Sequence, residues 1–434
     1  MEKALIAAVT GIEANQTYLD VIGNNIANSD TTGYKSSDAV FTDLLAEQIA
    51  GATAPGPSSA GVNPVAVGSG VRVGAVTDDL SQGSLQQTNE PTDIAIQGNG
   101  FLVANQNGTT LFTRAGHLQI DANGNLSTPT GGLIQGWQAD SSGNINSTGP
   151  TSGVVVPTGE VTAAVETTQI SMSGNLPEWT GSGTAPVVST TINAYDALGD
   201  SVPTTLTFTG VASTANEWTM QATVPKAGGG TQDLFSTPPT VTFDATNGQI
   251  KTISGVTQNS DGSWSVPVGT MPPNPPYNFQ ASDTWKIQFP ASNSAQAVTQ
   301  YSGATTLKAS GQDGSSSGTL ESFSIGEDGV ITGSFSNGRT QGIAQIALAI
   351  FANSGGLASQ GNLMYSATPN SGQASVGPPN SSGRGSLIGG SLESSNVNLA
   401  TQLTDLVEAQ EAYQANTKVI ATTATVLQAL STMP

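Results

Sequence analysis

Apolar residues recur every seven positions in two segments at the opposite ends of this 434-residue chain. In the first segment the repeat consists of Leu5, Ile12, Leu19 and Ile26, with Ala8 and Ile22 at the intervening d positions. In the second segment the same spacing is formed by Leu399, Leu403, Leu406, Tyr413, Ile420 and Leu427. A stripe with this period belongs to a helix that packs against other helices. We predict one helix over residues 1–28 and another that begins near Asn396 or Asn398, with either Asn as its cap.

Two interpretations of these helices remain open on the pattern alone. The helices can dock on the protein's own core, or they can pair and join copies of the chain into an assembly. Polar residues interrupt the two stripes at Asn15, Gln410 and Thr417. Such positions weaken a helix pair but fix its register and its number of partners. Because a monomer has less need of that, the pattern favours an assembly in which the two chain ends meet.

Between the helices the sequence is rich in Gly, Ser and Thr, and its apolar residues alternate with polar ones, as they do in β-strands. The alternation is clearest in the strand with Val202, Thr204, Leu206 and Phe208 on one face, and in the next, with Trp218, Met220, Ala222 and Val224. Turn-forming Asx-Gly pairs separate the strands. This pattern predicts a β-sandwich or barrel over residues 168–311.

The predicted fold class is mainly β with paired terminal helices, which form a coiled-coil-like end domain that carries nested β domains. The helical assembly domain comprises residues 1–30 and 396–434. Connectors follow at 31–70, with a short helix around 41–49, and at 366–395. A discontinuous middle β domain is expected from residues 71–167 and 312–365, and an outer β domain from 168–311. The chain would then run outward, turn in the outer domain and return.

Composition narrows the classes of function. The formal net charge is −20 and only 11 residues are Lys or Arg, which argues against partners such as nucleic acid or anionic membranes. The chain contains no cysteine, so disulfides and thiolate metal sites are excluded. The N-terminus lacks the apolar core of a cleaved secretory signal. The longest apolar run, residues 346–352, is too short to span a bilayer, so no lipid-embedded segment is expected.

Candidate chemical groups are few. His117 is the only histidine, and a metal site or a catalytic base needs partners that the chain does not offer. Residues 121–125 begin like a calcium loop, but position 12 of that loop is Gly132 instead of a bidentate Glu. We interpret the segment as a β-turn. Because no P-loop, nucleophile elbow or dinucleotide motif occurs, we expect no catalytic, metal or cofactor-binding residues, no cofactor, and no enzyme.

Several stretches resemble the signature of the bacterial flagellar rod and hook protein family. The most specific is residues 19–35, LDVIGNNIANSDTTGYK. Others are SQGSLQQT at 81–88, DIAIQGNGF at 93–101, and FTRAG at 112–116, leading to Gly136-Trp137. Near the C-terminus, ESSNVNL at 393–399 and AQEAYQANTKVI at 409–420 match as well. The resemblance covers both ends and the flanking β segments, and it is weak in residues 168–311.

Within this family, rod proteins are shorter and lack a large outer β insertion, so the chain resembles hook subunits most. The resemblance implies a non-enzymatic subunit that polymerises helically into a curved flexible tube and transmits torque from motor to filament. It implies export through the flagellar apparatus without signal cleavage, and a location in the hook and basal body outside the cell. The implied partners are further copies of the chain and the rod, hook-cap and hook–filament junction proteins.

The residues expected to mediate self-assembly combine the two stripes with the signature asparagines. They are Leu5, Ile12, Leu19, Ile22, Asn24, Asn25, Ile26, Asn28, Leu399, Leu403, Leu406, Tyr413, Asn416, Ile420 and Leu427. Two alternative functions stay open here. One is a distal rod subunit of the flagellar basal body; the other, from a different class, is a secreted β-rich enzyme or adhesin that uses its ends to oligomerise.

Overall fold

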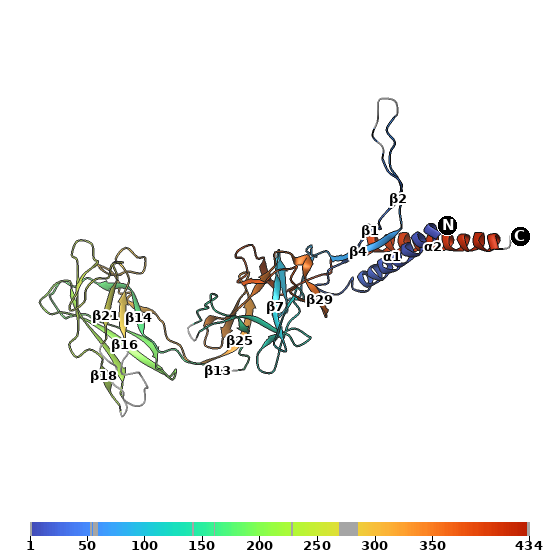
Figure 1. The fold of residues 1–434 in the computed structure, drawn as a ribbon. Helices are drawn as coiled ribbons and strands as arrows, with labels where there is room; N and C mark the ends of the chain where they lie inside the picture. Colours follow the sequence, from blue (N-terminus) through green and yellow to red (C-terminus); the bar gives the residue numbers. More distant parts are fainter. Residues whose placement is uncertain are drawn as a thin grey trace. The chain divides into compact units, whose positions relative to one another are not determined.

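The computed structural model describes residues 2–52, 54, 60–140, 143–159, 161–226, 229–268 and 285–431. The chain forms two compact units (Figure 1). Unit 1 comprises residues 1–157, 323–333 and 341–434, and unit 2 comprises residues 158–322 and 334–340. The chain crosses between the units after Pro157 and again within β25 (Gly318–Ile325), β26 (Val330–Phe335) and β27 (Thr340–Ile346).

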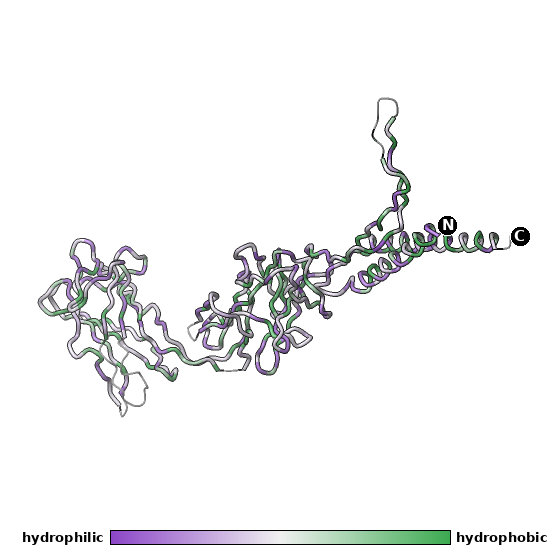
Figure 2. Tube along the Cα trace, in the orientation of Figure 1, coloured by the Kyte–Doolittle hydropathy of each residue, from purple (hydrophilic) through white to green (hydrophobic). Residues whose placement is uncertain are grey.

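Unit 1 contains both helices, α1 (Glu2–Ala27) and α2 (Leu399–Ser431), which pack side by side (Figure 1). Both contain a mixture of hydrophobic and hydrophilic residues along their length (Figure 2). The cap of α2 is as predicted, because Asn398 Oδ1 accepts hydrogen bonds from the backbone N–H groups of Ala400 and Thr401, at 3.1 and 3.3 Å. Such a cap satisfies donors that the first turn of a helix cannot pair internally.

The β part of unit 1 is built from two distant pieces of the chain. Its N-terminal strands are β1 (Ser37–Asp43), β2 (Glu47–Ala50), β3 (Val65–Val67), β4 (Val71–Asp78), β5 (Leu85–Gln87), β6 (Ile94–Gln97), β7 (Phe101–Gln106), β8 (Thr109–Thr113), β9 (Gln119–Ile120), β10 (Leu126–Ser127), β11 (Leu133–Gln138) and β12 (Ser152–Gly153). The C-terminal piece adds β28 (Leu348–Ile350), the short 3₁₀ helix η1 (Ser354–Gly356), β29 (Ala358–Gly361), β30 (Met364–Ser366), β31 (Ser375–Gly377), β32 (Ser386–Gly389) and β33 (Ser391–Glu393).

Antiparallel pairing joins these two pieces. Strand β7 pairs with β28, β8 with β30, and β11 with β27. Near the chain ends, β5 pairs with β33 and β6 with β32. The core between the pieces includes Phe101, Phe112, Trp137, Ala347 and Tyr365. The β part of unit 1 is therefore assembled from two pieces of the chain that are distant in sequence.

Residues 41–49 do not form the predicted short helix. They contribute to β1 and β2 instead, and β1 pairs with β4 over its whole length. Strand β4 is rich in Val and Thr, which favour a pleated strand. Pairing with β4 stabilises β1 as a strand, whereas a helix of nine residues would be marginal on its own. The segments expected as connectors, 31–70 and 366–395, thus carry strands β1 to β3 and β31 to β33.

Unit 2 is a sandwich of two sheets. One contains β15 (Val187–Tyr195), β16 (Ser201–Gly210), β17 (Glu217–Pro225), β18 (Thr231–Asp233), β19 (Thr240–Phe243) and β20 (Ile250–Ile253). The other contains β14 (Gln169–Pro177), β21 (Trp264–Pro267), β22 (Lys286–Phe289), β23 (Val298–Tyr301) and β24 (Lys308–Gln312). The short β13 (Val161–Thr162) pairs with β25. In the described residues the two sheets do not close into a barrel.

The core of unit 2 lies where the alternation predicted it. Every second residue of β16 and β17 is buried, including Leu206, Phe208, Trp218 and Met220, each 0% exposed. The intervening residues point outward and are mostly Thr and Gln. The observed fold, mainly β with helices at both ends, therefore agrees with the predicted class.

Candidate assembly surface

The two helices pack through small and polar residues. Buried residues are Ala8, Gly11, Ala14, Ile22 and Asn25 on α1, and Ala409 and Thr423 on α2. At Gly11, a Cβ atom would lie 2.7 Å from Nδ2 of Asn416. The missing side chain at Gly11 thus gives room for Asn416, and the helices approach closely. We call this contact the intrachain seam.

The large apolar residues predicted for assembly lie mostly beside the intrachain seam. Of these, Ile22 is buried, at 1% exposed. Others are half-buried, namely Leu5, Ile12, Leu19, Ile26, Leu406, Tyr413 and Ile420, as are Asn28 and Asn416. Leu399, Leu403 and Leu427 are exposed, at 46%, 48% and 49%. The apolar a positions of α1 are thus only half-buried, whereas Ala8, Gly11, Ala14 and Asn25 are buried.

Further apolar side chains on the helices are exposed to the same degree. These are Ile6 and Val9 on α1, and Val407, Val419 and Val426 on α2. Together with Leu399, Leu403 and Leu427 they form the set that we call the helix flanks. The pairing of α1 with α2 thus leaves much of their apolar surface uncovered within one chain.

Asn25 fastens the end of α1 to two other segments. Its Nδ2 donates to Ser37 O at 2.7 Å and to Gln402 Oε1 at 3.0 Å. Its Oδ1 accepts from Ser37 N at 2.9 Å and from the Tyr34 hydroxyl at 3.1 Å. All four hydrogen-bonding positions of the amide are therefore used. The side chain fixes the start of β1 and the first turns of α2 relative to α1.

The neighbouring signature asparagines have a local role. Asn28 Nδ2 donates to the backbone oxygen and to the Oδ1 of Asn24, at 2.9 and 3.0 Å. Asn24 itself is exposed and Asn28 half-buried. These bonds tie the Asn28 side chain to the last turn of α1, where the Asn24 carbonyl also accepts from the backbone N–H of Asn28 at 3.1 Å.

A buried ion cluster lies next to this fastening point. Glu393 Oε1 accepts from Lys35 Nζ at 2.7 Å and from Gly83 N at 2.8 Å, while its Oε2 accepts from Arg114 Nε at 3.3 Å. The side chains of Lys35 and Glu393 are 0% exposed and that of Arg114 is 4% exposed. Burial lowers the pKa of Lys35, and the hydrogen bond with Glu393 opposes that shift. We call this group the joint cluster.

The joint cluster brings four of the signature stretches together. Lys35 follows α1, Gly83 follows β4, Arg114 follows β8, and Glu393 ends β33. Gly33 N donates to Glu393 O at 2.7 Å from a backbone with a φ of 75°, which favours glycine. At Gly83 a Cβ atom would lie 2.1 Å from the carbonyl oxygen of Ser394. The spacing of apolar residues gives no signal for Lys35, Arg114 and Glu393, although each lies in a quoted motif.

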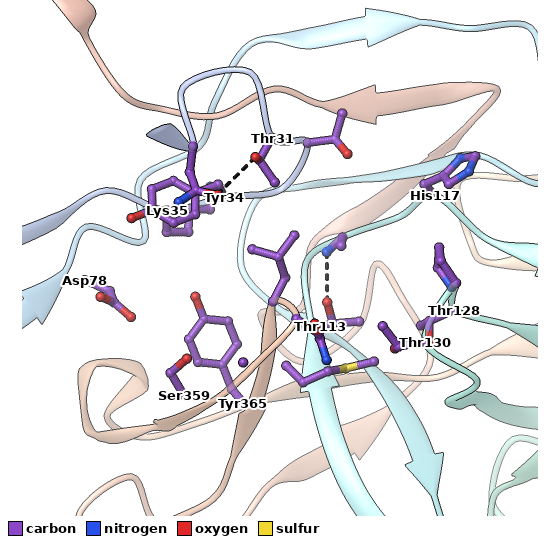
Figure 3. Close-up of a pocket in the computed structure, with 18 of the residues that line it drawn as sticks. Thr31, Tyr34, Lys35, Asp78, Thr113, His117, Thr128, Thr130, Ser359 and Tyr365 are labelled. Atoms are coloured by element: carbon purple, nitrogen blue, oxygen red, sulfur yellow. Dashed lines mark hydrogen bonds between the residues drawn. The ribbon is translucent and has the colours of Figure 1, made fainter. Parts of the chain in front are cut away.

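A cavity of about 710 Å³ lies beside the joint cluster and is lined by the end of α1, β8, and the β29–β30 hairpin (Figure 3). Tyr34, Asp78 and Tyr365 lie at one end, and Thr128, Thr130 and His117 at the other (Figure 3). Burial raises the pKa of Tyr365 to about 12, and the charge of Asp78 contributes. Burial also raises the pKa of Tyr34. Most of the lining consists of neutral hydroxyl and amide groups.

The groups considered for chemistry have structural partners. His117 Nδ1 lies 2.8 Å from Asp93 Oδ1, and the histidine side chain is 50% exposed. Asp121 Oδ1 accepts from the backbone N–H groups of Asn123 and Asn125, which is the pattern of an Asx turn between β9 and β10. Among the described residues no group of His, Cys, Asp and Glu could hold a metal ion. None of the described helices has the length and apolar character of a membrane span.

A second exposed apolar surface lies on the hairpin formed by β2 and β3, which we call the arm (Figure 1). Every residue of both strands is exposed. On the segments that form and adjoin it, Leu45 is 91% exposed, Ile49 63% and Val62 58%. At its base, β1 packs on α1 through an edge-to-face contact of Phe41 with Tyr18, at 5.6 Å between ring centroids. A two-stranded hairpin of this kind is marginal on its own in water.

Four family models match the chain and together span most of it. They are the flagella basal body rod protein at residues 5–35, the flagellar hook protein FlgE/F/G D1 domain at 95–176, the flagellar basal body protein FlaE D2 domain at 177–315, and the flagellar basal body rod FlgEFG protein C-terminal at 388–433. The first and last models coincide with the segments that form α1 and α2.

Curated relatives match over nearly the full length. The flagellar hook protein FlgE of Treponema pallidum is 36% identical, with 98% of each chain covered. That of Escherichia coli is 33% identical over 98% of this chain and 99% of its own. The solved Helicobacter pylori flagellar hook protein FlgE2 has a similar fold, with a TM-score of 0.50, 15% identity, and coverage of 70% of this chain and 98% of that one. The chain belongs to the flagellar hook protein FlgE family.

Proposed function

We propose that this chain is a structural, non-enzymatic subunit of the bacterial flagellar hook. Copies polymerise helically into a curved flexible tube that transmits torque from the motor to the filament. The main observation behind this assembly mechanism is that each helix has one buried side and one exposed apolar side. Small residues fill the intrachain seam, and the helix flanks remain exposed for contacts between copies.

The helix flanks offer a substantial driving force. Full burial of one Val, Leu or Ile side chain contributes about 1.5–3 kcal/mol. The eight flank residues are between 40% and 54% exposed, so their burial between copies contributes roughly 1 kcal/mol each. Exposed apolar surface of this extent marks an interaction site. The predicted residues Leu399, Leu403 and Leu427 belong to this set, whereas Asn25 and Ile22 act within one chain.

The arm provides a second contact between copies. Ile49 and Val65 on its strands and Leu45 just before β2 are exposed, and β2 and β3 pair only with each other among the described strands. A free strand edge with apolar side chains is a template for association. In the tube, this surface packs against neighbouring copies and stabilises them.

Bending requires neighbouring copies to shift along the tube. Half of the ten outward residues of β16 and β17 are Thr and only one is charged, and such polar surfaces exchange contacts with little change in free energy. The helix pairs and the joint cluster keep the inner layer intact meanwhile. The outer sandwich of residues 168–311 therefore slides past its counterparts in neighbouring copies.

The partners follow from this role. They are further copies of the chain, the rod, hook-cap and hook–filament junction proteins, and the flagellar export apparatus. The subunit leaves the cell without cleavage of a signal peptide and resides in the hook. The full-length hook protein relatives favour this function over a distal rod subunit and over a secreted β-rich enzyme or adhesin.

The test changes the helix flanks without touching the intrachain seam. Leu403→Asn combined with Val407→Asn should prevent polymerisation of the purified chain and abolish motility, while the melting temperature of the monomer stays unchanged. Val187→Asn is the matched control, because Val187 is 64% exposed and lies on unit 2. Tubes of normal yield from the double variant would contradict the proposal.

A further inference from the structure

A polar groove of about 920 Å³ lies on the surface of unit 2. It is formed by β14, β23, β24 and the loop that precedes β23. Its wall includes hydroxyl and amide side chains, among them Asn175, Gln249, Gln296 and Thr299, with one aromatic ring, Tyr301, and one cation, Lys308. Among the described residues that line the groove there is no carboxylate and no Val, Leu, Ile, Met, Phe or Trp.

The ring of Tyr301 is exposed but held in a fixed orientation. It is 51% exposed. Its hydroxyl donates to Asn247 O at 2.9 Å, and a Cβ atom on Gly248 would lie 2.7 Å from its Cε1, so the ring rests against the Gly248 backbone. Asn175 Oδ1 accepts from the backbone N–H of Tyr301 at 2.8 Å. The ring is therefore already ordered in the groove, so a ligand that binds to it would cause little loss of Tyr301 side-chain entropy.

The lining excludes most classes of ligand. Drug-like molecules and apolar peptides need walls made mainly of hydrophobic side chains. Nucleic acid needs clustered Lys and Arg, whereas this groove has Lys308 alone in a chain of net charge −20. That charge also repels anions in general. The hydroxyl and amide side chains and the Tyr301 ring of the groove suit a neutral ligand with many hydroxyl groups and an apolar ring face.

We propose that this groove binds a neutral oligosaccharide. One sugar ring lies with its C–H face on Tyr301, because an aromatic ring offers apolar contact area together with a polar tip. The hydroxyl groups of the sugar exchange hydrogen bonds with Gln296 and Thr299, and the Lys308 ammonium donates to hydroxyl oxygens. This function goes beyond assembly of the hook and lies on the outer domain, where it does not involve the helix pair.

The test measures binding of neutral oligosaccharides to the full chain. Maltohexaose, cellohexaose and chitohexaose are examined by saturation-transfer NMR, with oligogalacturonate as the acidic comparison. We expect saturable binding of at least one neutral sugar. Tyr301→Ala should weaken it about tenfold or more, because the apolar contact area of the ring is lost. Tyr301→Phe should change it by less than about threefold, since the ring remains.

Two further variants keep the test decisive if Tyr301→Ala alters the fold. Gln296→Ala and Lys308→Gln change exposed lining residues and should each weaken binding, while Thr207→Ala, on an outward position of β16, should not. Absence of binding by all three neutral sugars would overturn the proposal. So would binding that none of the groove variants weakens, or tighter binding of oligogalacturonate than of every neutral sugar.

Discussion

The joint cluster gives the sharpest prediction of local stability, through the substitution Glu393→Gln. The side chain keeps its shape, but its charge is lost while Lys35 and Arg114 stay buried beside it. Removing one partner of a buried ion pair costs about 3–5 kcal/mol, because the remaining charge is left uncompensated. Here two cations share one carboxylate, so the upper part of that range applies. The backbone N–H of Gly83 also loses its charged acceptor.

Hydrogen exchange followed by mass spectrometry measures this effect where it occurs. Peptides that cover residues 31–36, 81–84 and 391–396 contain the backbone groups around Glu393, including Gly33 N and Gly83 N. A loss of 3–5 kcal/mol speeds exchange by about 10² to 10⁴-fold when it is governed by opening of this region. Peptides from unit 2 should exchange at an unchanged rate.

Glu327→Gln is the matched control, since Glu327 is exposed and also belongs to unit 1. Surface substitutions of this kind change stability by about 0.5 kcal/mol at most. If Glu393→Gln and Glu327→Gln gave the same exchange rates around residues 33 and 83, the joint cluster would not hold the three segments together.

The remaining predictions concern the helices and alkaline pH. Gly11→Leu should lower the melting temperature of the polymer, because overpacking costs about 1–3 kcal/mol; Gly23→Leu should not, since nothing lies within 4 Å of a Cβ at Gly23. An unchanged Gly11→Leu polymer would argue against the intrachain seam. The pKa of Tyr365 is raised to about 12, so its neutral form contributes stability that is complete below pH 10 and lost as pH rises to about 12. About 2 pKa units correspond to roughly 2.7 kcal/mol. In alkaline unfolding experiments the free energy of unfolding should fall by that amount in the parent protein as Tyr365 ionises, and Tyr365→Phe should not show this fall. Finally, circular dichroism should show less helix in the monomer than in the polymer, because helices are stabilised mostly by packing of their apolar faces and the helix flanks are covered only in the polymer; full helix content in the monomer would refute this expectation.

The period of the apolar residues predicted those helices and strands in which side chains of one kind recur on the same face. The alternation in β16 and β17 is of that kind, since it sets one face against a core, and the heptads of α1 and α2 likewise mark one side of each helix. The segment 41–49 is different, because its conformation depends on pairing with β4 across a loop. Local pattern does not contain that long-range contact.

The site divides in a similar way. The large apolar residues of the stripes could be read from their spacing, but the small residues that form the intrachain seam, such as Gly11 and Ala14, carry no strong signal of their own. The joint cluster could not be predicted from the sequence, because Lys35, Arg114 and Glu393 are far apart in it and each appears as an ordinary surface charge. Only folding brings them within hydrogen-bonding distance.

The central claim is that the terminal helices are needed for assembly and not for the folding of the β units. Electron microscopy of polymers from the purified full chain, compared with chains that lack residues 1–30 or 398–434, tests it most directly. The full chain should form curved tubes and neither shortened chain should form any, although each shortened chain keeps the thermal unfolding transition of unit 2. Tubes formed by a shortened chain would contradict it.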